Sequence, residues 1–352
     1  TRNFQSGQFE GVAEIDGIAL KEKYLIRPKA CYRCPIACGR LTEVDDPKYG
    51  GKGEGPEYET ISALGSACGI DNLAALTKAN YVCNELGMDT ITAGMTVAAA
   101  MEMYEKGHIP ESDIGYPLRF GDPDALIESL KKMANREGFG DILAEGSYRM
   151  AAKYGHPEFS ITAKKLEFPG YDPRGAKGMG LLYATSNIGA SHMTGDLAYA
   201  EVFGVPEKID PLTIKNKPAL IKHWEDAFAI IDAAGLCVFL SVRYMFNTEI
   251  KIGPENLTKA MNFTTGADYT LESLLEAGER IYNLERLFLV KAGFDKTDDT
   301  LPPRMLEEPL PTGPAQGQVV ELEEMLGEFY KLRGWDENGI PTAEKLEELG
   351  LE

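Results

Sequence analysis

The chain has 352 residues, of which 43% are hydrophobic, and it carries 55 acidic against 36 basic side chains, a formal net charge of −19. This length suits two or three domains, and the hydrophobic content argues against wholesale disorder. A surface this acidic repels phosphate backbones and anionic lipid, which argues against nucleic-acid and membrane partners. No apolar run is long enough to span a bilayer and no signal peptide is recognisable, so we expect a soluble, cytoplasmic protein.

Helical patterns dominate after residue 60, whereas the first 60 residues are rich in glycine, proline and charge. The segment 45–59, DDPKYGGKGEGPEYE, is predicted to be a loop. Asp71 and Asp141 are candidate N-caps, and Asp122 precedes a proline at the first helical position. The predicted helices cover residues 72–86, 90–107, 125–136, 142–154, 223–234, 271–292, 322–332 and 343–349.

Convincing alternating strands are scarce, so the predicted fold class is mainly α, multihelical, with long functional loops. A domain boundary is predicted near residue 160, where helix gives way to SITAKKLEFPGYDPRGAKG, and it divides the chain into domains 1–160 and 161–352. The chain begins TRNFQSGQFEGV, without an initiator methionine and without a helix or strand pattern. We therefore expect it to be a piece of a longer or cleaved protein.

Three of the six cysteines, Cys31, Cys34 and Cys38, lie in KACYRCPIACGR with the spacing C-x2-C-x3-C. Six cysteines are too few for a disulfide framework in a chain of this length, and a tight cluster favours a metal site. Pro35 prevents a regular helix, so the thiolates can converge on an iron–sulfur cluster, which commonly takes three local ligands and one distant one. A structural zinc site or buried thiols are the alternatives, although zinc sites usually show a second C-x2-C or histidine pair.

The fourth ligand could be any of the remaining cysteines. Cys68 lies among small residues and Cys83 within a predicted helix, which is typical of buried thiols, whereas Cys237 follows a helix end in DAAGLC (232–237). A similar segment, NELGMD (84–89), ends an earlier helix. Carbonyls at helix ends and a neighbouring carboxylate suit a flat heterocycle with a donor edge, such as a pterin. From these residues alone, two ordinary glycine-terminated helices are the simpler interpretation.

Two further segments contain candidate acid–base groups. GPEYET (55–60) contains Glu57 and Glu59. The glycine-rich segment YDPRGAKGMGLLYATSNIGASH (171–192) is a candidate active-site loop that ends in His192. A single histidine is more often structural than catalytic, so both roles stay open for His192 at this point.

The segments CYRCPIACGR, GPEYET, NELGMDTITAG, REGFGDILAEGS, YDPRGAKGMGLLYATSN and DAAGLC, in this order, resemble the tungsten-containing aldehyde ferredoxin oxidoreductases, as does the tail LRGWDENGIPTAEKLEELG. The resemblance covers essentially all 352 residues and corresponds to that family's two helical C-terminal domains. It implies a tungsten (or molybdenum) bis-pterin beside a 4Fe-4S cluster. It also implies oxidation of an aldehyde with water to a carboxylic acid, with electrons passing through the cluster to ferredoxin.

The resemblance assigns roles to individual residues. The implied ligands of the iron–sulfur cluster are Cys31, Cys34, Cys38 and Cys237. The implied pterin-binding residues are Asn84, Gly87, Asp89, Asp232, Gly235 and Leu236. The implied catalytic residues, which would line the substrate pocket and handle protons, are Glu57, Glu59 and His192.

Three departures accompany the resemblance. The family's N-terminal domain, which forms a base under the pterins, is missing from this sequence, so we expect this polypeptide alone not to retain the tungsten cofactor. Asn84 stands where the family usually has Asp, which removes a charge from that pterin contact. Lys78 and Tyr81 occupy the glutamate and histidine positions of a metal site between subunits in one family member, so that site is predicted to be absent.

Two alternative functions compete with aldehyde oxidation. One is that of a relative of the tungsten subunit of the benzoyl-coenzyme A reductases, which uses the cofactor for reduction. The other is a truncated pair of helical domains without catalysis of its own. The preserved GPEYET and DPRG segments favour aldehyde oxidation.

The resemblance also implies partners. They are a small-molecule aldehyde, ferredoxin and the family's N-terminal domain, and they could include a second copy of the chain in a homo-oligomer. Because ferredoxins are usually acidic, a net charge of −19 does not attract them, and docking would require a local basic patch.

Overall fold

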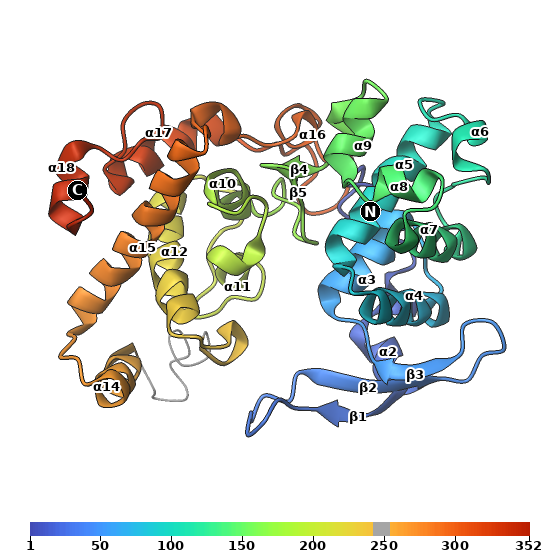
Figure 1. Ribbon diagram of the computed structural model, residues 1–352, viewed down its shortest axis with the longest axis horizontal. Coiled ribbons are helices and arrows are strands. Elements are labelled where there is room, and N and C mark those ends of the chain that lie inside the picture. Colours follow the sequence, from blue (N-terminus) through green and yellow to red (C-terminus); the bar gives the residue numbers. More distant parts are fainter. Residues whose placement is uncertain (242–253) are drawn as a thin grey trace. The chain divides into compact units, whose positions relative to one another are not determined.

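The computed structural model describes residues 1–241 and 254–352, which pack into two compact units (Figure 1). Unit 1 consists of Thr1–Gly170 and Pro302–Gly317, and unit 2 of Tyr171–Leu301 and Gln318–Glu352. The predicted division between residues 160 and 161 stays a prediction. The compact units meet in the chain after residue 170, and a short later segment, Pro302–Gly317, belongs to unit 1. The described residues are mostly helical, which confirms the predicted mainly α fold.

Helices make up most of unit 1. They are α1 (Val12–Ile15), α2 (Gly17–Lys23), α3 (Tyr58–Leu64), α4 (Leu73–Leu86), α5 (Thr90–Glu105), α6 (Glu111–Ile114), α7 (Pro123–Asn135), α8 (Phe139–Leu143), α9 (Ser147–Lys153) and α16 (Pro303–Glu307), with 3₁₀ turns η1 (Ser66–Cys68) and η2 (Pro157–Phe159). The sequence predicted several of their ends. α4 ends at Gly87, whose φ of 67° is the left-handed conformation that glycine adopts readily. α7 begins as predicted, with Asp122 as N-cap and Pro123 in the first turn.

Two predicted helix starts in unit 1 are wrong. The side chain that caps α4 is Asn72, which accepts the Ala75 N–H, and not Asp71. Asp141 lies inside α8, and the helix predicted over residues 142–154 is split into α8 and α9. The break falls at Gly146, whose φ of 84° lies outside the helical region.

A three-stranded antiparallel sheet lies ahead of the main helices in the sequence, with the order β1 (Leu25–Lys29), β2 (Gly39–Val44) and β3 (Gly51–Glu54). The segment 45–59, predicted to be a loop, therefore contains a strand and the start of α3. Its glycines have a packing reason, since a Cβ at Gly51 would lie 3.0 Å from the ring of Tyr81. A second, two-stranded sheet pairs β4 (Thr162–Ala163) with β5 (Leu166–Glu167).

Helix α5 forms the centre of unit 1, and its residues 97–101 are completely buried. A Cβ at Gly94 would lie 2.6 Å from the backbone of Ala63, so glycine permits the close approach of α3. The carboxylate of Glu102 binds the guanidinium of Arg304 through two hydrogen bonds of 2.8 Å. This buried ion pair attaches the returning segment 302–317 to unit 1.

The described part of unit 2 is helical throughout its regular structure. Its elements are α10 (Lys177–Thr185), η3 (His192–Thr194), α11 (Ala198–Glu201), α12 (Lys217–Ala233), α14 (Pro254–Thr265), α15 (Leu271–Lys291), η4 (Lys296–Asp298), α17 (Leu322–Arg333) and α18 (Ala343–Leu349). α12 begins before the predicted residue 223, because Pro218 occupies its first turn. α15 packs closely on α12, since a Cβ at Gly278 would overlap the carbonyl oxygen of Asp226.

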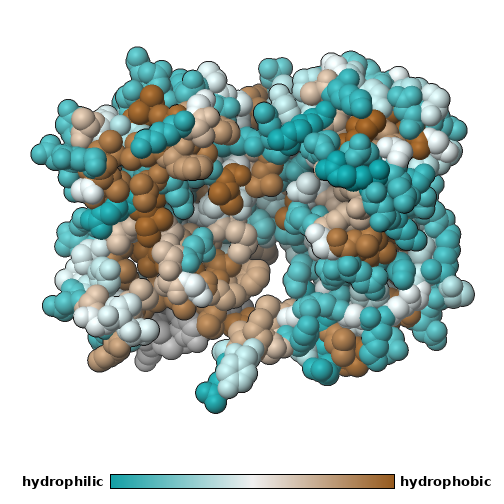
Figure 2. Space-filling view, in the orientation of Figure 1, coloured by the Kyte–Doolittle hydropathy of each residue, from teal (hydrophilic) through white to brown (hydrophobic). Residues whose placement is uncertain are grey.

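Exposed side chains of unit 2 include large apolar groups. Figure 2 shows hydrophobic side chains gathered along α15 on the face in view. The exposed apolar side chains of this helix are Leu284 and Phe288. Across the two described stretches of the chain, we find no helix with both the length and the apolar character needed to cross a membrane.

Candidate functional site

The three clustered cysteines lie in the loop that joins β1 to β2, at the tip of a hairpin. The loop turns tightly, with the Cys34 N–H donating to Cys31 O at 3.0 Å and a left-handed backbone at Arg33 and Ala37. Cys31 and Cys38 are exposed, and Cys34 is half-buried. The hairpin therefore presents three thiols at a surface that a metal cluster can reach.

The other three cysteines differ in their exposure. Cys68 and Cys83 are completely buried, as expected, and burial raises the pKa of both thiols, that of Cys83 to about 12. Such thiols are poor thiolate ligands. Cys237 of unit 2 is exposed. The four predicted ligands are thus the four accessible cysteines. In residues 1–241 and 254–352, no three His, Cys, Asp or Glu side chains are gathered as a metal site, so this ligand set stays a prediction.

A pocket of about 620 Å³ opens at the end of α4, and we call it the unit 1 pocket. Its lining residues are Lys52, Gly53, Glu54, Gly55, Glu57, Thr60, Asn80, Tyr81, Asn84, Glu85, Met88, Asp89 and Thr90. The predicted pterin-binding residues Asn84 and Asp89 are among them. Asp89 is the N-cap of α5, and its carboxylate accepts the Thr92 N–H at 2.6 Å. Gly87 turns the chain between the two helices.

The two glutamates of GPEYET have different surroundings. Glu57 is exposed, lines the unit 1 pocket and forms an ion pair with Arg40. Glu59 is largely buried. Its Oε2 accepts the Gly170 N–H at 2.6 Å, and its Oε1 has no hydrogen-bond partner among the described residues. Burial raises the pKa of Glu59 to about 7, although the Gly170 N–H opposes this shift. Glu59 is therefore present in both protonation states near neutral pH.

A second pocket, of about 260 Å³, opens between the end of α12 and α15, and we call it the unit 2 pocket. Its lining residues are Asn187, Ile188, Thr194, Glu225, Ala229, Asp232, Ala233, Ile281, Tyr282 and Glu285. Asp232, a predicted pterin-binding residue, lies in the last turn of α12, and partial burial raises the pKa of its carboxyl. Gly235 then adopts a left-handed conformation with a φ of 67°, and Leu236 follows with an exposed side chain.

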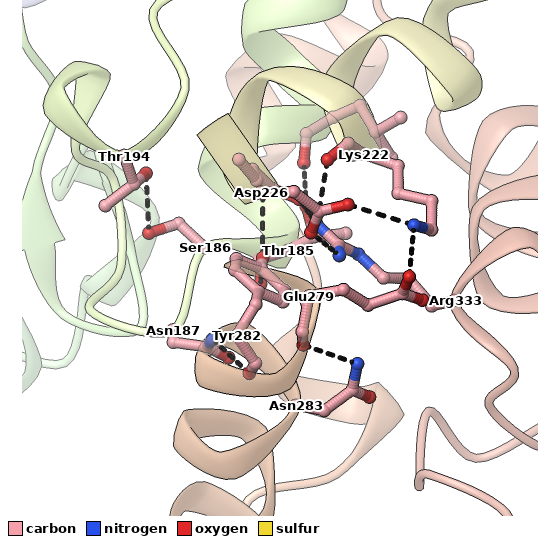
Figure 3. Close-up of polar contacts among 12 residues, drawn as sticks. Thr185, Ser186, Asn187, Thr194, Lys222, Asp226, Glu279, Tyr282, Asn283 and Arg333 are labelled. Atoms are coloured by element: carbon pink, nitrogen blue, oxygen red, sulfur yellow. Dashed lines mark hydrogen bonds and ion pairs between the residues drawn. The ribbon is translucent and has the colours of Figure 1, made fainter. Parts of the chain in front are cut away.

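Two of these lining residues belong to a buried charge network (Figure 3). The Tyr282 hydroxyl donates to Glu225 at 2.7 Å, and the guanidinium of Arg333 binds Glu225 at 2.6 Å and also pairs with Asp226. Lys222 adds a hydrogen bond to Asp226 at 2.9 Å. Burial raises the pKa of Glu225 to about 7, although Arg333 opposes this shift. The network joins α12, α15 and α17 beneath the pocket.

His192 lies in η3, and the centre of its ring is 5.8 Å from that of Tyr171. Burial lowers the pKa of His192 to about 4, so its imidazole is neutral at neutral pH. The glycine-rich segment 171–192 that precedes it is not the predicted loop throughout, because residues 177–185 form the buried helix α10. Its Gly180 lets the helix pack closely, since a Cβ there would lie 2.9 Å from Val320.

Three residues of the unit 2 pocket carry no signal in the local sequence. Glu225 and Asp232 both come from α12, whereas Asn187 follows α10 and Glu285 lies on α15. The packing of α10 and α15 against α12 brings Asn187 and Glu285 next to Asp232. A signal would have been the helical spacing of Glu225 and Asp232 on one face of α12, but that spacing is shared by many solvent-facing acids.

The donor atoms of each unit fit the implied groups. Accessible thiols on a tight loop are the ligands that iron–sulfur clusters take. The carboxylates of Asp89 and Asp232 and, in unit 2, the unpartnered amide oxygen of Asn187 suit a flat heterocycle rich in hydrogen-bond donors. Glu59 of unit 1 and His192 of unit 2 have pKa values that suit proton exchange and neutral hydrogen bonding, respectively.

Two multihelical units, each with a pocket at the end of a helix, define the chain as a pair of mainly α units. The chain belongs to the aldehyde ferredoxin oxidoreductase family, because residues 1–351 match the family described as "Aldehyde ferredoxin oxidoreductase, domains 2 & 3". The match confirms the resemblance found in the sequence.

Individual relatives agree with this assignment. The tungsten-containing aldehyde ferredoxin oxidoreductase of Pyrococcus furiosus is 49% identical over 354 residues, which cover 99% of this chain and 57% of that relative. The "Aliphatic sulfonate oxidoreductase, WOR-like subunit" of the same organism is 30% identical, over 99% of this chain and 54% of that relative. The chain thus spans little more than half the length of the curated relatives it matches.

A solved structure shares the fold. The active site complex BamBC of benzoyl coenzyme A reductase, in complex with 1,5-dienoyl-CoA, superposes with a TM-score of 0.76 at 24% identity. The superposition covers 95% of this chain and 54% of that chain. At this identity the likeness shows a common fold.

Proposed function

We propose that this chain forms part of a tungsten–pterin oxidoreductase that oxidises aldehydes to carboxylic acids. The reaction converts RCHO and H2O into RCOOH, two electrons and two protons. The observation that carries the proposal is that NELGMD and DAAGLC each end a helix at a pocket, with Asp89 lining one pocket and Asp232 the other. Relatives at 49% identity, which are tungsten-containing aldehyde ferredoxin oxidoreductases, support it.

The bound tungsten–pterin group would supply the acceptor for the two electrons. The chain's contribution is to hold the heterocycles at the two helix ends, where carbonyl and carboxylate oxygens accept hydrogen bonds from an amine edge. The residues proposed for this binding are Asn84, Gly87 and Asp89 in unit 1, and Asp232, Gly235 and Leu236 in unit 2.

The proposed ligands of a 4Fe-4S cluster are the hairpin cysteines Cys31, Cys34 and Cys38, together with Cys237 of unit 2. Their support is accessibility, because these four thiols can reach iron, whereas burial encloses the thiols of Cys68 and Cys83 and raises their pKa. The segment DAAGLC would then bind two cofactors, because Asp232 would bind a pterin and Cys237 would ligate an iron of the cluster.

Glu59 and His192 are the proposed proton-handling residues. A pKa of about 7 allows the Glu59 carboxylate to accept a proton at neutral pH and to release it afterwards. The neutral imidazole of His192 can donate a hydrogen bond to a carbonyl oxygen and so orient an aldehyde. Glu57 is the weaker candidate, because it is exposed and paired with Arg40.

The proposed electron acceptor is an acidic ferredoxin, and the cysteine hairpin provides the local basic patch that its docking requires. In a chain of net charge −19, the segment 21–40 contains six basic residues and one acidic residue. Lys21, Arg27 and Arg33 of this segment are exposed, and no ion pair is found for them among the described residues. Opposite charges next to the predicted cluster would steer an acidic carrier to the site of electron exit.

An activity assay tests the proposal against its alternatives. The chain is produced together with the family's N-terminal domain and purified anaerobically after growth with tungstate, and aldehyde-dependent reduction of a viologen dye is measured beside dye-dependent reduction of an aromatic coenzyme A thioester. We expect the first activity and not the second. Thioester reduction alone would favour the reductase alternative, and the absence of both activities in a tungsten-loaded protein would contradict catalysis.

Metal analysis tests the ligand set separately. The wild-type chain is reconstituted anaerobically with iron and sulfide, and about four irons per chain are expected. Cys34→Ser should lower this number, whereas Cys83→Ser, a matched change at a buried thiol, should not. Equal iron in both variants would contradict the proposed cluster ligands.

A further inference from the structure

The unit 2 pocket contains an amide and a second carboxylate that no motif segment of the family predicts. We propose that Asn187 and Glu285, together with Asp232, form a recognition site for the amine-bearing edge of a flat heterocycle. The proposed function identifies this edge as the 2-amino-4-oxopyrimidine of a pterin. The inference rests on that function for the identity of the ligand, and it adds two binding residues.

The hydrogen bonds of Asn187 leave one acceptor unused. Its Nδ2 donates to Tyr282 O at 3.1 Å (Figure 3) and also to Glu285 Oε2 at 3.3 Å. These two bonds occupy both amide protons and orient the side chain. Asn187 is only 8% exposed, and its Oδ1 is buried without a partner among the described residues. Because a buried acceptor without a donor is costly, the site calls for a ligand that donates.

The charges of the pocket also favour a ligand that donates hydrogen bonds. Asp232 and Glu285 lie at its exposed rim, and no cationic side chain is among the described residues that line it. Partial burial at the rim raises the pKa of Glu285, the hydrogen bond from Asn187 opposes this shift, and the charge of Asp232 adds to it. The two carboxylates are therefore close enough to repel each other, and a donor edge placed between them would relieve this repulsion.

The walls of the pocket suit a planar ring. Ala229 and Ala233 lie one turn apart on α12, and Ile188 and Ile281 provide further apolar surface. A volume of about 260 Å³ admits a small ring system, whose substituents can extend through the open rim. A metal ion is a poorer match, because no three carboxylate, thiol or imidazole groups of the described residues converge on one point.

Fluorescence titration with free pterin (2-amino-4-oxopteridine) tests the proposal on the 352-residue protein. The comparison ligand is lumazine (2,4-dioxopteridine), in which an oxygen replaces the 2-amino group. We expect the wild type to bind pterin more tightly than lumazine, because only pterin offers the amine. Glu285→Gln and Asn187→Ala should each weaken pterin binding by about tenfold. Each should also reduce the ratio of the affinity for pterin to the affinity for lumazine.

Controls separate binding from folding. Glu272→Gln changes an exposed acid in the first turn of the same helix, and it should bind pterin as the wild type does. Glu285 is exposed, so its substitution should leave thermal unfolding unchanged even if Asn187→Ala lowers stability.

Each outcome decides a separate question. Unchanged pterin affinity in both variants, or equal affinity of the wild type for pterin and lumazine, would overturn the assignment of Glu285 and Asn187. No pterin binding by the wild type at millimolar concentration would overturn the pocket as a recognition site. If pterin binds as expected but the tungsten-loaded protein does not oxidise aldehydes, the inference stands and the proposed function fails.

Discussion

The helix ends at NELGMD and DAAGLC have closely similar sequences but form different sites. At the first position, unit 1 has the neutral Asn84 and unit 2 the acidic Asp232. At the last position, Asp89 caps the following helix α5, whereas Cys237 presents an exposed thiol. The unit 1 pocket contains charges of both signs, including that of Lys52, while the described lining of the smaller unit 2 pocket offers acceptors and no cation.

The difference teaches that a glycine-terminated helix end offers the same free carbonyls in both units. The elements packed against that end determine which polar groups are left for a ligand. Free carbonyls occur at the end of both helices for the same reason, since the last turn lacks partners along the chain. In unit 1 the neighbours are the strand β3 and the start of α5, and α5 uses the Asp89 carboxylate as its N-cap. In unit 2 the neighbour is α15, which adds Glu285 and leaves the acceptors open to a ligand.

The largest expected loss of stability comes from removing Arg333 from the charge network beneath the unit 2 pocket. Arg333→Met leaves Glu225 buried without its cation and leaves Asp226 with Lys222 alone, so it should lower the free energy of unfolding by roughly 3–5 kcal/mol. Urea unfolding measures the loss, and hydrogen exchange should show reduced protection in α12 and α15 while α4 and α5 keep theirs. Lys331→Met, an exposed change on the same helix, should have little effect. Equal losses in both variants would contradict the role of the network.

The pH dependence of this loss has a defined sign. The pKa of Glu225 is about 7 in the folded protein against an ordinary value of 4.5, so the native state holds this proton more tightly than the unfolded state. The contribution of Glu225 to stability is therefore greatest below pH 4.5 and declines as the pH rises through 7. Because Arg333 lowers this pKa, its removal should be less harmful at pH 5 than at pH 8. A deficit independent of pH would show that Glu225 does not titrate as described.

A smaller effect concerns the close helix approaches in each unit. Gly278→Ala in unit 2 and Gly94→Ala in unit 1 each place a methyl group against a neighbouring backbone, which should lower the free energy of unfolding by roughly 1–3 kcal/mol. Gly327→Ala, on the exposed side of α17 with open space around it, should instead raise it by about 0.5–1 kcal/mol. Thermal and urea unfolding of the three variants distinguish a packing effect from helix propensity. Stabilisation by all three changes would contradict the packing.

A further prediction compares the stability lost when Asp89 or Asp232, the acids at the two helix ends, is replaced by alanine. Asp89→Ala removes the N-cap of α5 and should cost about 0.5–2 kcal/mol of stability. Asp232→Ala removes a carboxylate whose pKa burial raises, so it should cost nothing and could stabilise the fold. Urea unfolding at neutral pH measures both. A larger loss for Asp232→Ala would mean that this side chain has a structural role after all.

The smallest expected effect concerns the basic hairpin. Replacing Arg27 and Arg33 together by Gln should slow electron transfer to an acidic ferredoxin by roughly two- to tenfold at low salt, and the difference should vanish at high salt. Stopped-flow measurement of ferredoxin reduction gives the rates. Lys131→Gln, an exposed change on α7, is the matched control and should keep the wild-type rate.

Much of the helical architecture was predictable from local patterns. α15 and α18 match their predicted ranges almost residue for residue, because their apolar spacing and caps lie within the segments themselves. The C-x2-C-x3-C spacing likewise predicted a tight cysteine-bearing loop, and the composition around Cys68 and Cys83 predicted their burial. These features depend on neighbours within a few residues, which sequence patterns record.

The strand β3, the buried helix α10 and the grouping of Asn187 and Glu285 with Asp232 were decided by tertiary structure. The glycines of β3 and α10 suggest a loop in the sequence. In the structure a larger residue at Gly51 or Gly53 would collide with the ring of Tyr81, and one at Gly180 would collide with Val320. Glu285 is separated from Asp232 by a helix and a segment outside the described residues, so only the packing of α15 on α12 creates their shared pocket. The sequence by itself determined helices with their own caps and apolar spacing, such as α15 and α18, together with the cysteine loop and the helix-ending glycines. Long-range packing decided which polar groups meet, because that depends on contacts that no local pattern encodes.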